Sequence, residues 1–139
     1  MQNLEFNDGL KRLAINGDES RVIVINPSDI GIISRYNEVV PKLDEIIGKY
    51  DNIKNPTLEK AAEIISELDT EARKIIDYII GSPVSETVFG TANCLSSAGG
   101  QTIFENFLAA YMEYMTPAIK DEFEKSKKRV EKYTKQVKK

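Results

Sequence analysis

Residues 55–81 read NPTLEKAAEIISELDTEARKIIDYIIG and contain the strongest structural signal in the chain. Aliphatic side chains recur there at steps of three and four residues, which is the spacing of one helix face. Pro56 and Thr57 are typical of a helix start, and Gly81 supplies a C-terminal stop. Each large aliphatic side chain that this face buries contributes about 1.5–3 kcal/mol, so we expect the helix to anchor the core. The apolar face comprises Leu58, Ala61, Ala62, Ile65, Leu68, Ala72, Ile75, Ile76 and Ile79.

The first 26 residues have the pattern of short strands separated by turns. Turn signals stand at Asn7-Asp8-Gly9 and Asn16-Gly17-Asp18, where the residues tolerate positive φ. Residues 12–15 alternate between large aliphatic side chains and charged or small ones, as on a sheet with one covered face. We therefore predict an antiparallel β-meander over residues 1–26. Its three strands are expected at Leu4–Phe6, Leu10–Ile15 and Arg21–Ile25.

The rest of the chain is predicted to be mainly helical. Asn26-Pro27-Ser28-Asp29 is a typical helix start, and the helix from Pro27 to Ile47 should kink or divide at Pro41. Residues 82–101 are the least regular stretch, and a further amphipathic pattern follows from Gln101 to Pro117. The predicted class is α+β, in which a three-stranded antiparallel meander precedes a mainly α-helical body of four to five helices. Residues 1–119 form one domain, with residues 27–119 as its helical body, and residues 120–139 form a basic C-terminal helical tail.

Composition predicts a soluble globular protein. The chain has 139 residues, of which 41% are hydrophobic and 29% charged, as in an ordinary single domain. Its N-terminus lacks the pattern of a secretory leader, and its apolar runs fall far short of the ~20 residues that a membrane span needs. We therefore expect a cytoplasmic protein that does not bind a membrane.

The side chains of this protein are poorly suited to catalysis. There is no histidine and only one cysteine, Cys94, which excludes an imidazole base, an internal disulfide and the commonest transition-metal sites. Cys94 has no charged residue within five positions and is expected to be a packed structural thiol. The acidic residues from Asp44 to Glu71 lack the alternating pattern of a calcium loop. We predict no catalytic, cofactor-binding or metal-binding residue, and no enzymatic activity.

A small polar loop stands directly before the helix that begins near Gln101. Its sequence is Ser96-Ser97-Ala98-Gly99-Gly100, and free amides at a helix N-terminus can attract an anion. The loop lacks the lysine and the spacing of a P-loop and is not a dinucleotide fingerprint. We interpret it as a structural loop and helix cap.

Charge is divided unevenly along the chain. Residues 1–119 hold 10 Lys and Arg against 18 Asp and Glu, a net of −8, whereas residues 120–139 hold 9 against 4, a net of +5. The basic run Lys125–Arg129 could contact nucleic-acid phosphates. Three glutamates are interspersed with these cations and weaken their field, so a solvated or partner-binding helix is expected. A nucleic-acid-binding or other adaptor module acting through this helix is the alternative.

Apolar and aromatic side chains are spread around the helix that precedes Pro117, beyond one narrow stripe. Methionine and tyrosine are adaptable contact residues, so the surplus could bind another protein or a second copy of this chain. The other interpretation is that these side chains form ordinary core, since helices that are apolar on most sides are usually buried. The candidate partner-binding residues are Phe104, Phe107, Leu108, Tyr111, Met112 and Met115.

Two groups of residues carry a resemblance to a known family. The first comprises Leu13-Ala14-Ile15-Asn16-Gly17-Asp18, Arg21-Val22-Ile23 and Asn26-Pro27-Ser28-Asp29; the second comprises Val88-Phe89-Gly90 and Phe104-Glu105-Asn106-Phe107-Leu108. In these pieces the chain resembles the tail assembly chaperones of phages and prophages of Gram-positive bacteria. The resemblance implies a protein of the host cytoplasm that binds the tape-measure protein and assists tail tube assembly. It also implies a programmed frameshift that appends a second domain, with which the codons of Lys138-Lys139 are compatible.

The expected partner is therefore a protein, with the tape-measure protein and the tail tube protein as the specific expectations. Self-association into a homo-oligomer is a further interpretation of the same apolar surface. A nucleic-acid partner is disfavoured by the interspersed glutamates, and no cofactor is expected.

Overall fold

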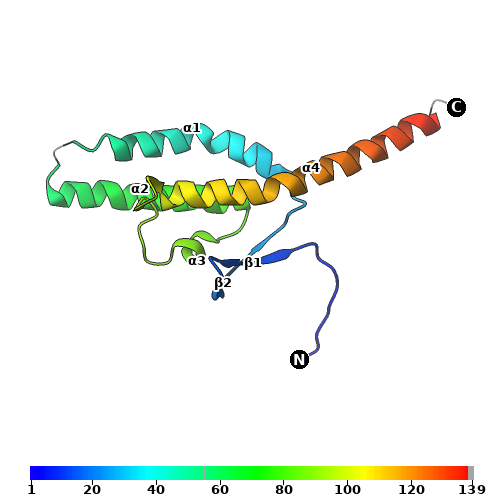
Figure 1. Cartoon of the computed structure of the whole chain (residues 1–139), viewed down its shortest axis with the longest axis horizontal. Coiled ribbons are helices and arrows are strands. Elements are labelled where there is room, and N and C mark those ends of the chain that lie inside the picture. Colours follow the sequence, from blue (N-terminus) through cyan, green and yellow to red (C-terminus); the bar gives the residue numbers. More distant parts are fainter. Residues whose placement is uncertain (55, 138–139) are drawn as a thin grey trace.

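The computed structural model describes the backbone of residues 1–54 and 56–137, and the side chains of residues 1–54, 56–118, 120 and 121. Figure 1 shows a layer of three long helices, with a β-hairpin and a short helix beneath it and the end of the last helix projecting beyond the others. The predicted α+β class is confirmed, and the described part of the chain contains four helices. The elements are β1 (Lys11–Ile15), β2 (Asp18–Ile25), α1 (Gly31–Asp51), α2 (Leu58–Ile80), α3 (Ser85–Phe89), β3 (Ser97–Ala98), β4 (Gln101–Thr102) and α4 (Ile103–Val137).

The N-terminal sheet has two strands, so the prediction of three is wrong. β1 and β2 pair antiparallel, from Lys11 opposite Ile25 to Ala14 opposite Val22. The turn between them is Asn16-Gly17, whose φ angles are 52° and 78°. A type I′ hairpin turn requires positive φ at both central residues, which is why Asn-Gly is its preferred sequence.

The predicted strand Leu4–Phe6 is absent because the chain does not reverse at Asp8-Gly9. Gly9 has a φ of 73°, but Asp8 is not in the left-handed region, so this pair does not form a type I′ turn. The side chains of Asn7 and Asp8 instead accept hydrogen bonds from the amides of Gly9 and Leu10, at 3.0 and 2.9 Å. Residues 1–10, called the arm below, contain neither helix nor strand and run away from the helices (Figure 1).

α2 supplies the centre of the core, as its aliphatic face predicts. Thr57 caps its N-terminus by accepting a hydrogen bond from the Lys60 amide at 3.2 Å, and Gly81 ends it with a φ of 81°. Leu58 and Ala62 are exposed, because the first turns of α2 extend beyond α4 (Figure 1). The buried residues of α2 are Leu68, Ala72, Ile75, Ile76, Ile79 and Ile80.

α1 begins at Gly31, four residues later than predicted, because residues 26–29 form a turn. The Asp29 amide donates to the Asn26 carbonyl at 3.1 Å, and the Asp29 carboxylate accepts from the Gly31 amide at 3.0 Å. One helix continues through Pro41, so two separate helices do not form. Arg35 then joins the start of α1 to the end of α2, pairing with Asp29 at 2.7 Å and donating to the Ile79 carbonyl at 3.0 Å.

α4 also begins at a side-chain cap. The Thr102 hydroxyl accepts from the Glu105 amide at 3.1 Å, while the Glu105 carboxylate accepts from the Thr102 amide at 3.2 Å, the reciprocal pattern of a capping box. The helix runs without interruption through Pro117 to Val137. Lys138-Lys139 lie outside the described residues. Over the described chain, none of the helices combines the length and the apolar character that crossing a bilayer requires.

A candidate groove for a protein partner

An open groove of about 730 Å³ lies between the β1–β2 hairpin, α3 and the first half of α4. Most of its wall is apolar, with Leu13 and Ile15 on one side and Phe107 and Ala110 on the other. Tyr114 lies on the α4 side and is 45% exposed. The groove is therefore a hydrophobic site that solvent reaches, bounded by segments that are far apart in the sequence.

Asp77 of α2 determines where α3 begins. Its carboxylate accepts hydrogen bonds from the Ser85 amide at 2.8 Å and from the Ser85 hydroxyl at 2.9 Å. Ser85 is buried, so both bonds are shielded from water. Because free amides at a helix start need an acceptor, this carboxylate positions α3 against α2.

Arg21 of β2 connects the hairpin to the other end of α3. Its Nε donates to the Thr87 carbonyl at 3.1 Å, and its Nη2 donates to the Val88 carbonyl. Carbonyl groups in the last turn of a helix lack helical partners and carry partial negative charge, which a guanidinium neutralises. Two walls of the groove are thereby held to each other.

Arg73 of α2 supports the loop that follows α3. Its Nη2 donates to the carbonyls of Gly90 and Ala92 at 2.9 and 2.6 Å, and its Nε pairs with Asp69 at 3.2 Å. Burial alone would raise the pKa of Asp69. Hydrogen bonds from Cys94 and Arg73 outweigh it and lower the pKa, so the carboxylate stays ionised.

Aromatic rings form the floor of the groove. The Phe107 ring meets the Phe89 ring edge to face, with 5.8 Å between centroids, and stacks on the Tyr111 ring at 6.1 Å. Both arrangements are favourable for aromatic pairs. Burial raises the pKa of Tyr111 to about 12, so its hydroxyl remains protonated at neutral pH.

Cys94 is buried, as expected of a packed thiol. Its amide donates to the Asp69 carboxylate at 2.8 Å, and its thiol lies 3.8 Å from the Asp69 carbonyl oxygen. Burial, with the negative charge of Asp69 beside it, raises the pKa of Cys94 well above the usual range. The thiol therefore stays protonated and is a poor nucleophile.

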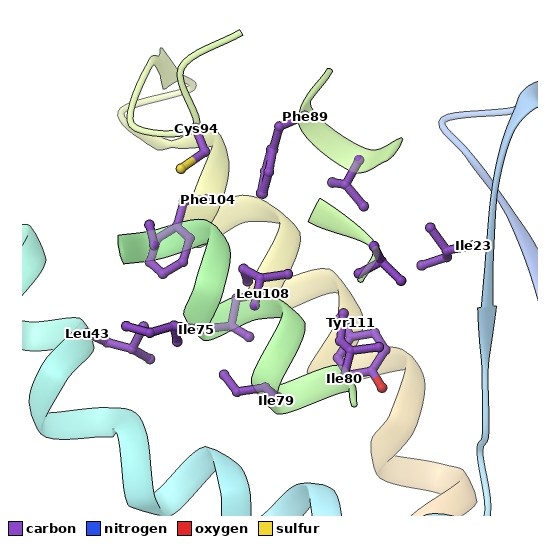
Figure 2. Packing of buried hydrophobic residues seen from close by; sticks show 14 of the residues in the cluster. Ile23, Leu43, Ile75, Ile79, Ile80, Phe89, Cys94, Phe104, Leu108 and Tyr111 are labelled. Atoms are coloured by element: carbon purple, nitrogen blue, oxygen red, sulfur yellow. The ribbon is translucent and has the colours of Figure 1, made fainter. Parts of the chain in front are cut away.

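The six candidate partner-binding residues do not all lie in one place. Phe104 and Leu108 are buried and point toward α2 (Figure 2), and Met115 is also buried. Met112 is partly exposed but does not line the groove. Phe107 and Tyr111 line the groove, although Tyr111 is itself buried. In this conformation Phe107 is thus the one member of the six that is both accessible and in the groove.

Other lining residues were not among the candidates. Leu13 and Ile15 were predicted to share one face of a sheet and Ile23 to lie in the strand Arg21–Ile25, while Ala110 is too small to stand out in a hydrophobic pattern. Tyr114 belongs to the aromatic band before Pro117, and that band was its only signal. No periodicity within one element could predict that these side chains meet.

No family model, curated protein or solved structure matches the chain. Within the described residues, no group of three or more His, Cys, Asp or Glu side chains could hold a metal ion. A second hollow, of about 520 Å³, lies beside the connection between α1 and α2 and is lined by both lysines and glutamates. Its mixed charge favours no particular ligand, so the apolar groove is the stronger candidate site.

Proposed function

We propose that this protein binds another protein and performs no catalysis itself, and that the groove receives one face of a partner's amphipathic helix. The observation that carries this proposal is the apolar groove, in which Arg21 joins the hairpin to α3 and Asp77 fixes α3 to α2. Amphipathic helices bind such grooves through apolar side chains spaced three and four residues apart. A groove that exists before the partner arrives reduces the entropy lost on binding.

The partner is proposed to be the tape-measure protein of a phage tail, with this chain as a tail assembly chaperone. The support is that both groups of residues carrying the family resemblance contribute to the groove. Leu13, Arg21 and Ile23 come from the first group, and Val88, Phe89 and Phe107 from the second. A chaperone of this kind would cover hydrophobic tape-measure helices until tail tube subunits polymerise around them, in the cytoplasm of the bacterial host.

Substitution of two adjacent alanines on α4 tests the proposal. Ala110 lines the groove and Ala109 does not, although both are exposed. Ala110→Arg places a long charged side chain in the groove and should weaken binding of a tape-measure fragment by at least about tenfold, equivalent to 1.4 kcal/mol. Ala109→Arg changes the charge equally and should bind like the unmodified chain.

The fragment is co-expressed with each variant, and its soluble yield and affinity are measured. Equal binding by the two arginine variants would exclude the groove as the site. Failure of the unmodified chain to bind any local tail protein would overturn the function. Affinity for nucleic acid that falls steeply with salt and vanishes without residues 120–139 would favour the alternative function instead.

A further inference from the structure

The arm exposes large apolar side chains that contact little else in the structure. Leu4 is 84% exposed and Phe6 is 74% exposed. They are separated by one residue, so in an extended strand their side chains would share one face, with Glu5 on the other. The arm therefore has the pattern of a half-covered strand that lacks a sheet.

β1 offers the corresponding edge. Within the described residues, β1 is paired on one side by β2 and the sheet has no third strand. Unpaired edges of this kind present free amides and carbonyls to which another extended segment can add. Leu13 and Ile15 of β1 are half-buried and line the groove, so a strand added at this edge would have one face over the groove.

Charge determines which face of the arm covers the groove. Arg12 lies on the outer face of β1, between Lys11 and Leu13, and is exposed. With Leu4 and Phe6 directed into the groove, Glu5 falls on the same outer face as Arg12, where the opposite charges attract. The reverse orientation would place Glu5 over an apolar cavity and leave Leu4 and Phe6 in water.

The arm does not reach the edge of its own β1, because Asp8-Gly9 does not form the turn that would reverse the chain. Figure 1 shows the arm extending away from the body. We infer that the arm pairs with β1 of a second copy of this chain, and that two copies exchange arms to form a symmetric dimer in which Leu4 and Phe6 occupy the groove of the partner copy. The inference rests on the groove assigned above and adds an occupant that a client helix must displace.

The mass of this 139-residue chain in solution, measured by light scattering at micromolar concentration, tests this inference. The unmodified chain should have twice the 15.6 kDa of one copy. Leu4→Asp combined with Phe6→Asp should reduce the mass to that of one copy, because the groove then excludes both side chains. Leu58→Asp is the matched control and should leave the dimer intact, since Leu58 is 88% exposed but lies at the start of α2.

Hydrogen exchange at residues 4–6 identifies what covers the arm. These amides should be protected in the dimer and exchange rapidly in the aspartate double variant. A monomeric unmodified chain, or a double variant that remains dimeric, would overturn the arm exchange. A monomer with protected arm amides would show that the arm binds its own chain, which also overturns it.

The mass measurement needs no client protein, so its outcome is separate from the proposed function. If the chain is monomeric and binds a tape-measure fragment, the arm exchange is wrong and the proposed chaperone role stands. If the chain is dimeric, and its double variant is monomeric but binds no tail protein, the chaperone role is wrong and the arm exchange stands.

Discussion

The guanidinium carbon of Arg73 lies 5.6 Å from the centroid of the Phe89 ring. At this distance a cation attracts the face of an aromatic ring. The same Arg73 side chain donates to the carbonyls of Gly90 and Ala92, so it holds both the aromatic floor of the groove and the loop behind it. The shape of the groove therefore depends on a residue that does not line it.

Arg73→Met should destabilise the fold by about 2 kcal/mol, because it leaves two carbonyls and the Asp69 carboxylate without their charged donor. The measurement is the free energy of unfolding in urea. Lys74→Met is the control, since Lys74 is the adjacent exposed residue of α2 and its change should cost less than about 0.5 kcal/mol. Equal losses in the two variants would mean that the Arg73 contacts contribute nothing.

Asp69 should make stability depend on pH in the acid range. Burial raises the pKa of Asp69, but hydrogen bonds from Cys94 and Arg73 lower it by more. The folded-state pKa of Asp69 is therefore below its ordinary value. A lowered folded-state pKa gives stability that is complete above the ordinary aspartate pKa of about 3.9 and is lost as pH falls through the folded value. Asp69→Asn should show a shallower loss than the unmodified chain in urea titrations over that range. A parallel pH dependence would exclude Asp69 as the source.

Cys94 should resist thiol reagents while the protein is folded. It is buried and its pKa is raised by burial and by Asp69, so the reactive thiolate does not form at neutral pH. Labelling with a chromogenic disulfide should be no faster than unfolding and should become immediate in urea. Thr91→Cys combined with Cys94→Ala gives the comparison, because position 91 is exposed and should label at once. Rapid labelling of folded Cys94 would contradict its burial.

Asp8→Asn should convert the proposed arm-exchanged dimer into a monomer in which the arm is still paired with a β1 strand. Asn-Gly adopts the type I′ turn more readily than Asp-Gly does here, as Asn16-Gly17 demonstrates between β1 and β2. The arm would then fold back onto its own β1, so residues 4–6 should stay protected from hydrogen exchange while the mass halves. Persistence of the dimer in this variant would show that the turn does not control the exchange.

Local signals in the sequence were sufficient for several elements. α2 was predicted from its aliphatic face and from Gly81, and the β1–β2 turn from Asn16-Gly17, because helix periodicity, caps and type I′ turns depend on neighbouring residues alone. The same reasoning failed at Asp8-Gly9, where side-chain hydrogen bonds to the local backbone replaced the turn. It also misplaced the start of α1, where Asn26 and Asp29 formed a turn before the helix.

The candidate site depended on tertiary structure. By itself the sequence determined that this chain has strands followed by long amphipathic helices, with more apolar surface than one stripe uses and no histidine. Tertiary packing then decided that Phe104, Leu108 and Met115 are buried in the core, while Phe107 faces a groove. The physical reason is that the groove is the space left between hairpin, α3 and α4, and its size depends on contacts such as Arg21 to the end of α3, which join residues more than 60 positions apart.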